Sequence, residues 1–151
     1  MQTPQLPRSF LNGRVGYVVA LAGSAISLFS FCAIPFGYTC FFVFCSSLSF
    51  WQQLVQDNVL SWVLLVVIII TCIVALIGTL LTSSPALAIS LIVFGLIGTG
   101  LFLWTITRVA TIPNTSIAIG IWLCFFGMIV AAIGGVAAIT GSRPLHPLNS
   151  H

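Results

Sequence analysis

Hydrophobic positions fill four long runs of this chain, and no charged residue interrupts them. The runs cover residues 15–34, 59–81, 86–107 and 117–140. A membrane-spanning helix needs about 20 predominantly apolar residues, so each run is long enough to cross a bilayer. The pattern predicts four spans with short connections, within a single integral membrane domain over residues 1–151.

The continuity of these runs predicts helices. In hydrocarbon every backbone amide must find a partner within the protein, which only helices and closed β-barrels achieve. Barrel strands alternate apolar and polar residues, whereas every residue of Val63–Ile70 is apolar. The expected fold is therefore an all-α membrane protein, a four-helix transmembrane bundle.

The second and third runs are separated by the tetrapeptide Thr82-Ser83-Ser84-Pro85. Serine is a favoured N-cap residue, and proline suits the first helical position, where its missing N–H is not needed. We therefore expect a tight helical hairpin, with one of the two serines capping the third helix and Pro85 in its first turn.

The longest connection, from Pro35 to Asn58, has a pattern of its own. Its apolar side chains recur every three or four residues, the spacing of one helix face, at Phe41, Phe44, Leu48, Trp51 and Val55. This pattern predicts an amphipathic segment that lies at the membrane interface as a helix. The alternative is a β-structured cap, because the segment Cys40–Cys45 is rich in phenylalanine.

Composition and charge add an orientation to this picture. Only 3% of the residues are charged, whereas soluble proteins have about 25%. Arg8 and Arg14 precede the first span and Arg143 follows the fourth, while Arg108 alone flanks an outer connection. Because arginines gather on the cytoplasmic side, we expect both termini in the cytoplasm and the chain in a plasma or inner membrane.

Tryptophan and arginine side chains mark the expected membrane interfaces. Amphipathic aromatic rings prefer the headgroup region, and an arginine at a helix end can extend its charged group toward it. The expected interface anchors are Trp51, Trp62, Trp104, Trp122 and Arg108.

Small residues form the faces through which we expect the helices to pack. Lipid tails are as apolar as leucine, so membrane helices associate through close packing, which favours small side chains at contacts. The predicted packing residues are Gly120, Gly127, Gly134, Gly141, Gly16, Ala20 and Gly23. The alternative use of the fourth-run glycines, which recur every seven residues, is a contact between copies of the chain.

Reactive side chains are scarce at membrane depth. Ionisable groups inside a membrane mark ion pathways and cofactor ligands, but Asp57 lies at an expected interface, and His146 and His151 lie in the C-terminal tail. We therefore predict no catalytic residue, no metal ligand and no cofactor. The expected partners are the lipid bilayer and either another membrane protein or a second copy, with no nucleic acid.

Cys40 and Cys45 form the candidate disulfide in the outer connection. A helix orients such a pair poorly, whereas a turn brings the Cα atoms within the separation of about 4.4–6.8 Å that a disulfide requires. A membrane thiol–disulfide redox protein is a remote alternative, because the outer connection around Pro113 has no second cysteine pair to relay electrons.

The predicted function is that of a small non-catalytic subunit, structural or accessory, because the chain offers packing surfaces but no reactive centre. The alternative is a small transporter or pore for a neutral or apolar solute. Its interior would be lined by the hydroxyl groups of Ser27, Ser30, Thr71 and Thr99.

Overall fold

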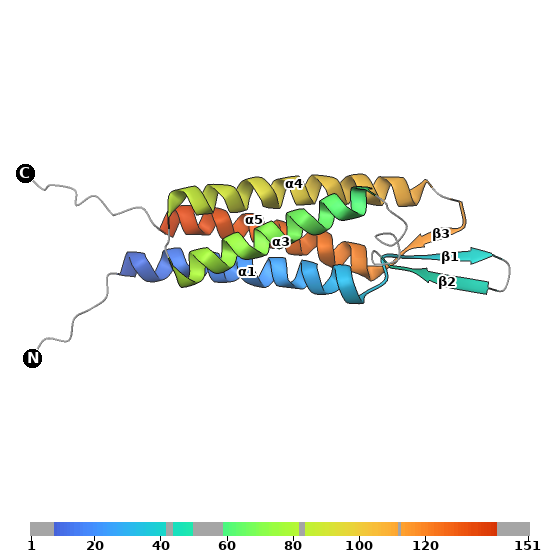
Figure 1. The fold of residues 1–151 in the computed structure, drawn as a ribbon, viewed down its shortest axis with the longest axis horizontal. Helices are drawn as coiled ribbons and strands as arrows, with labels where there is room; N and C mark the ends of the chain where they lie inside the picture. The colour runs from blue at the N-terminus through green and yellow to red at the C-terminus, as the bar shows by residue number, and fades with distance from the viewer. Residues whose placement is uncertain (1–7, 42–43, 50–58, 82–83, 112, 142–151) are drawn as a thin grey trace, which may run out of the picture.

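Four long helices lie side by side, and three short strands gather beyond one end of them (Figure 1). This computed structural model describes residues 8–41, 44–49, 59–81, 84–111 and 113–141. The elements, in chain order, are α1 (Arg8–Ala33), β1 (Gly37–Phe41), β2 (Phe44–Leu48), α3 (Val59–Leu80), α4 (Pro85–Ala110), β3 (Thr115–Ile117) and α5 (Ile119–Gly141).

The prediction of four long apolar helices is confirmed. The stretches long and apolar enough to cross a membrane are Arg14–Ala33, Val59–Leu80, Pro85–Ala110 and Ile119–Gly141. Three boundaries differ by more than one residue: α1 begins earlier, at Arg8, α4 continues to Ala110, and α5 begins later, at Ile119, because Thr115–Ile117 forms β3. The other helix ends lie within one residue of the predicted ones. The arrangement is compatible with a multi-pass membrane protein and a transmembrane bundle.

The start of α4 follows the predicted turn chemistry. Ser84 is the N-cap residue, and its hydroxyl accepts a hydrogen bond of 3.3 Å from the backbone N–H of Leu87. Pro85 occupies the first turn, where a missing N–H leaves no helical hydrogen bond unmade. α3 and α4 pack against each other and run antiparallel (Figure 1).

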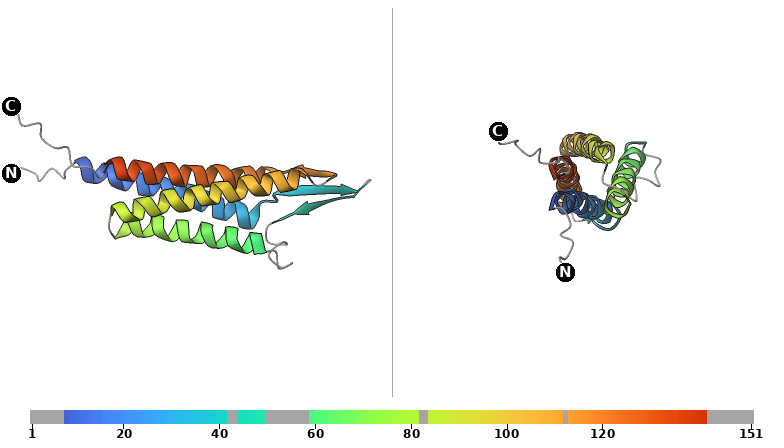
Figure 2. Two further views of the ribbon diagram at one scale, coloured as in Figure 1. Left: turned by 90° about the horizontal axis from the view of Figure 1, so that it is seen from above. Right: turned by 90° about the vertical axis from the view of Figure 1, so that its left-hand side faces the viewer.

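The helices form a ring in which each one packs against two others. The contacting pairs are α1 with α5, α5 with α4, α4 with α3, and α3 with α1. Seen along their length in Figure 2, the four helices occupy the corners of a square. Bulky buried side chains fill the half nearer the strands, among them Phe31, Phe36, Leu64, Phe102 and Met128. The other half is filled by Tyr17, Leu91 and several alanines.

The strands form one antiparallel sheet in the order β2-β1-β3, which we call the cap. The prediction of an interfacial helix is therefore wrong for residues 37–41 and 44–48, and the all-α description is incomplete. The competing interpretation, a β-structured cap, is the one observed. The segment 50–58, which includes Trp51 and Val55 of the expected helix, lies outside the described residues.

The sheet forms because β1 has a pairing partner far along the chain, which the pattern of apolar residues within 35–58 does not reveal. β1 pairs on one side with β2 and on the other with β3, which comes from the connection between α4 and α5. A hydrogen bond of 2.9 Å from the Ala118 N–H to the Phe36 carbonyl also joins the two connections. Pairing gives each strand main-chain hydrogen bonds to its neighbours. These bonds favour the sheet, although the apolar residues have the spacing of a helix face.

Candidate functional site

The closest helix contact in the molecule is the seam between α1 and α5. A Cβ atom added at Gly134 would lie 2.5 Å from the Ala20 nitrogen and 2.6 Å from the Gly16 oxygen. A Cβ atom added at Gly23 would lie 2.6 Å from the Gly127 oxygen. Ordinary van der Waals contacts begin at 3.4 Å, so the two backbones touch where no side chain fits.

The structure brings the predicted packing residues together, with one exception at the end of α5. The buried residues among them are Gly16, Ala20, Gly23, Gly120, Gly127 and Gly134. Gly120 faces the backbone after α1, where an added Cβ would lie 2.9 Å from the Ile34 oxygen. Gly141, the last residue of α5, is half-buried. Of the fourth-run glycines, Gly127 and Gly134 therefore pack against α1 of the same chain.

A pair of hydrogen bonds crosses this seam at Ser27 and Cys124. The Ser27 hydroxyl donates to the Cys124 carbonyl at 3.0 Å, and the Cys124 thiol donates to the Ser27 carbonyl at 3.4 Å. The Ser27 hydroxyl also lies 3.2 Å from the Gly23 carbonyl within α1. Both side chains are buried, so these bonds hold α1 and α5 in one register.

Three of the four hydroxyl groups expected to line a pore, those of Ser27, Thr71 and Thr99, donate hydrogen bonds to backbone carbonyls. Thr71 donates to the Val67 carbonyl at 2.7 Å within α3. Thr99 donates to the Gly95 carbonyl at 2.8 Å and lines an outer groove rather than the interior. Ser30 is buried in α1. Thr99 therefore lies at the groove between α4 and α5, and the hydroxyl-lined pore stays a prediction.

The expected anchors that the structure describes gather near the cap. Trp62 lies in the first turn of α3, Trp104 near the end of α4 and Trp122 in the first turn of α5, and all three are exposed. The Arg108 guanidinium carbon lies 5.1 Å from the centroid of the Trp104 ring, within the range of a cation–π interaction. Trp51 lies outside the described residues.

The cap contains the candidate disulfide. Cys45 is disulfide-bonded, and Cys40 lies opposite it in the register of β1 and β2. Directly opposite residues of antiparallel strands have Cα atoms about 4.5–5.5 Å apart, a separation that a disulfide bridges without strain. The side chain of Cys40 is not among those described, so its bond to Cys45 stays a prediction. The free cysteines among the described residues are Cys32, Cys72 and Cys124.

One face of the cap presents a row of polar and aromatic side chains. Tyr38 lies opposite Ser47 on one side and Ser116 on the other, and because side chains alternate along a strand, the three share a face. Tyr38 is 41% exposed, and both serines are exposed. We call Tyr38, Ser47 and Ser116 the cap row.

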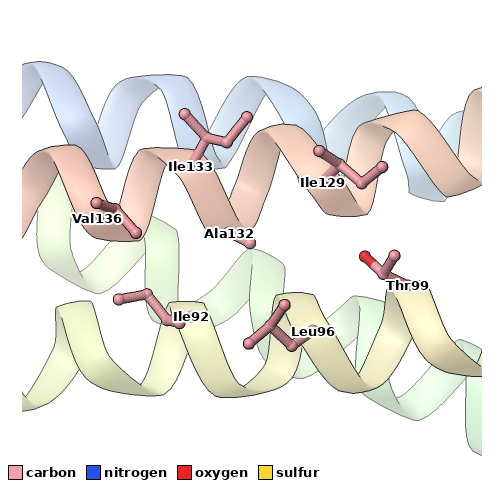
Figure 3. Close-up of a pocket in the computed structure, with 7 residues that line it drawn as sticks. All are labelled: Ile92, Leu96, Thr99, Ile129, Ala132, Ile133 and Val136. Atoms are coloured by element: carbon pink, nitrogen blue, oxygen red, sulfur yellow. The ribbon is translucent and has the colours of Figure 1, made fainter.

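A groove runs between α4 and α5 on the outside of the bundle (Figure 3). Its volume is about 310 Å³, and its lining residues are Ile92, Leu96, Thr99, Ile129, Ala132, Ile133 and Val136. The Thr99 hydroxyl is already bonded to the backbone of α4. The groove therefore offers apolar contacts and suits a hydrocarbon ligand.

A second hollow, of about 240 Å³, lies further along α4 and is lined by Gly100, Leu103, Trp104 and Thr107. A Cβ atom added at Gly100 would meet nothing within 4 Å. By contrast, one added at Gly95 would lie 2.8 Å from Ala132. Packing against α5 thus explains why residue 95 is a glycine, but no contact within the chain explains the glycine at position 100.

Sequence reasoning missed both the hollow and the cap row. A signal for the hollow existed, because successive helix residues are about 100° apart and Gly100 therefore points away from the small face of Gly95 and Gly98. The cap row had no such signal, since its register joins three separate segments.

Among the described side chains, no three histidine, cysteine, aspartate or glutamate residues lie close enough to hold a metal ion. No protein family, curated protein or solved structure matches this chain. The surface features that the described residues offer to a ligand or partner are the cap, the outer groove and the α4 hollow.

Proposed function

We propose that this protein is a non-catalytic integral membrane protein, a structural or accessory subunit that presents its cap to a partner. The partner is the extramembrane part of another membrane protein or of a second copy. The chain lies in a plasma or inner membrane, with both termini in the cytoplasm and the cap outside.

Two independent features support this orientation. α1 begins and α5 ends at the end of the bundle away from the cap (Figure 1), and Arg8, Arg14 and Arg143 lie in or next to these segments. Arginines concentrate on the cytoplasmic side. At the opposite end Cys45 is disulfide-bonded, and disulfides persist in oxidising compartments outside the cytosol.

The observation that carries the proposed function is the cap row on a fixed sheet. Tyrosine and serine are frequent in protein recognition surfaces, because tyrosine supplies a large rigid contact and serine an adaptable hydrogen bond. β1 follows α1 and β3 precedes α5, so the sheet is held by the two helices that pack most closely. The cap row is therefore presented in a defined position.

The packing of the helices also favours the cap as the contact surface. The glycine faces of α1 and α5 are filled by each other, so they cannot admit a helix from another protein without separating. A partner must therefore use surfaces that remain exposed, and the cap row is one that carries both an aromatic ring and hydroxyl groups.

The test places a photo-crosslinking amino acid at Ser47, in the cap row, in native membranes. The control site is Thr140, which is exposed near the other end of α5. We expect a discrete adduct from position 47 and none from position 140, and a Tyr38→Ala change should reduce the adduct several-fold. An equal adduct in the Tyr38→Ala variant, or none from position 47, would exclude the cap row as a partner surface.

A further inference from the structure

We propose that one phospholipid binds along the outward face of α4. Its phosphate lies on the guanidinium of Arg108, and one acyl chain occupies the hollow at Gly100 and extends toward the groove between α4 and α5. This site is separate from the cap row, and the inference does not depend on the proposed function.

The charge of Arg108 selects the headgroup. Arg108 is exposed in the last turn of α4, and its guanidinium lies beside the Trp104 ring. The described residues include no aspartate or glutamate, and the single acidic residue of the sequence is Asp57. A guanidinium donates two parallel hydrogen bonds to a phosphate, and an arginine beside tryptophan at the end of a span lies at headgroup depth.

The hollow at Gly100 accepts the acyl chain. Gly100, Leu103, Trp104 and Thr107 line it, and they share one side of α4 because they are three or four residues apart. A glycine in a helix is less favourable than alanine, and here no internal contact requires it. What the missing side chain provides is an open space on the outer surface.

The neighbours of Gly100 favour a flexible chain over a partner helix. Two helices approach closely where small residues recur every four positions. The positions four before and four after Gly100 are Leu96 and Trp104, which are 61% and 54% exposed. These bulky side chains hold a straight helix away from the hollow, whereas an acyl chain can bend between them.

The spacing along α4 matches one leaflet of a bilayer. From Arg108 back to Leu96 the helix rises about 18 Å, at about 1.5 Å per residue. The hydrocarbon of one leaflet is about 15 Å thick. An acyl chain whose phosphate lies at Arg108 therefore ends near Leu96 and Thr99, which line the groove in Figure 3.

The experiment is native mass spectrometry of the full chain in mild detergent, titrated with dioleoyl phosphatidylglycerol or with dioleoylglycerol, which lacks the phosphate. We expect one retained phosphatidylglycerol. Arg108→Gln should weaken its binding about five- to tenfold and leave dioleoylglycerol binding unchanged. Gly100→Leu, which fills the hollow, should weaken both lipids by a similar factor.

Two variants serve as matched controls. Arg14→Gln removes an equal charge from an exposed position at the other end of the bundle, and Ala86→Leu adds the same side chain at an exposed position near the start of α4. Neither should change lipid retention. The proposal is overturned if Arg108→Gln binds phosphatidylglycerol as tightly as Arg14→Gln does. The same result is expected if Asp57 neutralises Arg108. The proposal is equally overturned if Gly100→Leu behaves like Ala86→Leu, or if inorganic phosphate alone displaces the lipid.

Discussion

A single methyl group at Gly134 should separate the two helices that pack most closely. Gly134 is buried in α5, and a Cβ atom there would lie 2.5 Å from the Ala20 nitrogen and 2.6 Å from the Gly16 oxygen. Both are backbone atoms of α1, so no side-chain rotation relieves the overlap. Gly134→Ala therefore forces α1 to move as a unit.

The size of the effect follows from the overlap. Ordinary contacts begin at 3.4 Å, so α1 must retreat by about 1 Å, and inserting a methyl group into packed structure costs about 1–3 kcal/mol. Replacing glycine by alanine in a helix returns about 1 kcal/mol. Because the strained atoms are backbone, we expect a net loss of about 2 kcal/mol, or about 30-fold in the unfolding equilibrium constant.

The assay is reversible unfolding in mixed detergent micelles, followed by far-ultraviolet circular dichroism. Gly100→Ala is the matched control, because it makes the same change on the exposed side of α4, where an added Cβ meets nothing within 4 Å. It should leave stability unchanged or raise it. Equal stabilities for the two variants would refute the close packing of Gly134 against α1. A Gly134→Ala protein that kept its stability and changed only its oligomeric state would refute it too.

Three further predictions concern bonds within the chain. Tyr17→Phe removes the 2.7 Å hydrogen bond to the Ser84 carbonyl and should lower the free energy of unfolding by about 1 kcal/mol in the same assay; no change would mean that the bond is not made. Thiol alkylation of the unfolded, unreduced chain should label three of the five cysteines, since Cys45 is bonded; mass spectrometry that counts four or five labels would contradict this. Ser27→Ala removes the bond to the Cys124 carbonyl and should cost about 0.6 kcal/mol, the average for hydrogen bonds between membrane helices; a loss of several kcal/mol would point to a larger role.

The helices could be predicted from the sequence because each one carries its own signal. The apolar run of α3 was expected over residues 59–81 and is observed as Val59–Leu80. The start of α4 was equally local, since Ser84 caps the helix that Pro85 begins. Such features depend only on residues that are close in the sequence, so the sequence alone is enough to predict them.

The cap could not be predicted in the same way. Phe41, Phe44 and Leu48 have the spacing of a helix face, yet Phe41 pairs with Phe44 across two antiparallel strands. What decides the structure is the pairing of β1 with β3, a segment that follows α4. A local period contains no information about a partner so far along the chain, so the pattern of apolar residues alone favoured the helix.

The glycines show why the outer surface was harder to infer than the interior. In the sequence Gly95, Gly98 and Gly100 are near neighbours in one apolar run, but a methyl group at Gly95 would meet Ala132 of α5 and one at Gly98 would meet Met128. Gly100 alone of the three faces open space. Since a small residue inside a helix is disfavoured unless something packs against it, the position without an internal neighbour is the one that points to a ligand outside the chain.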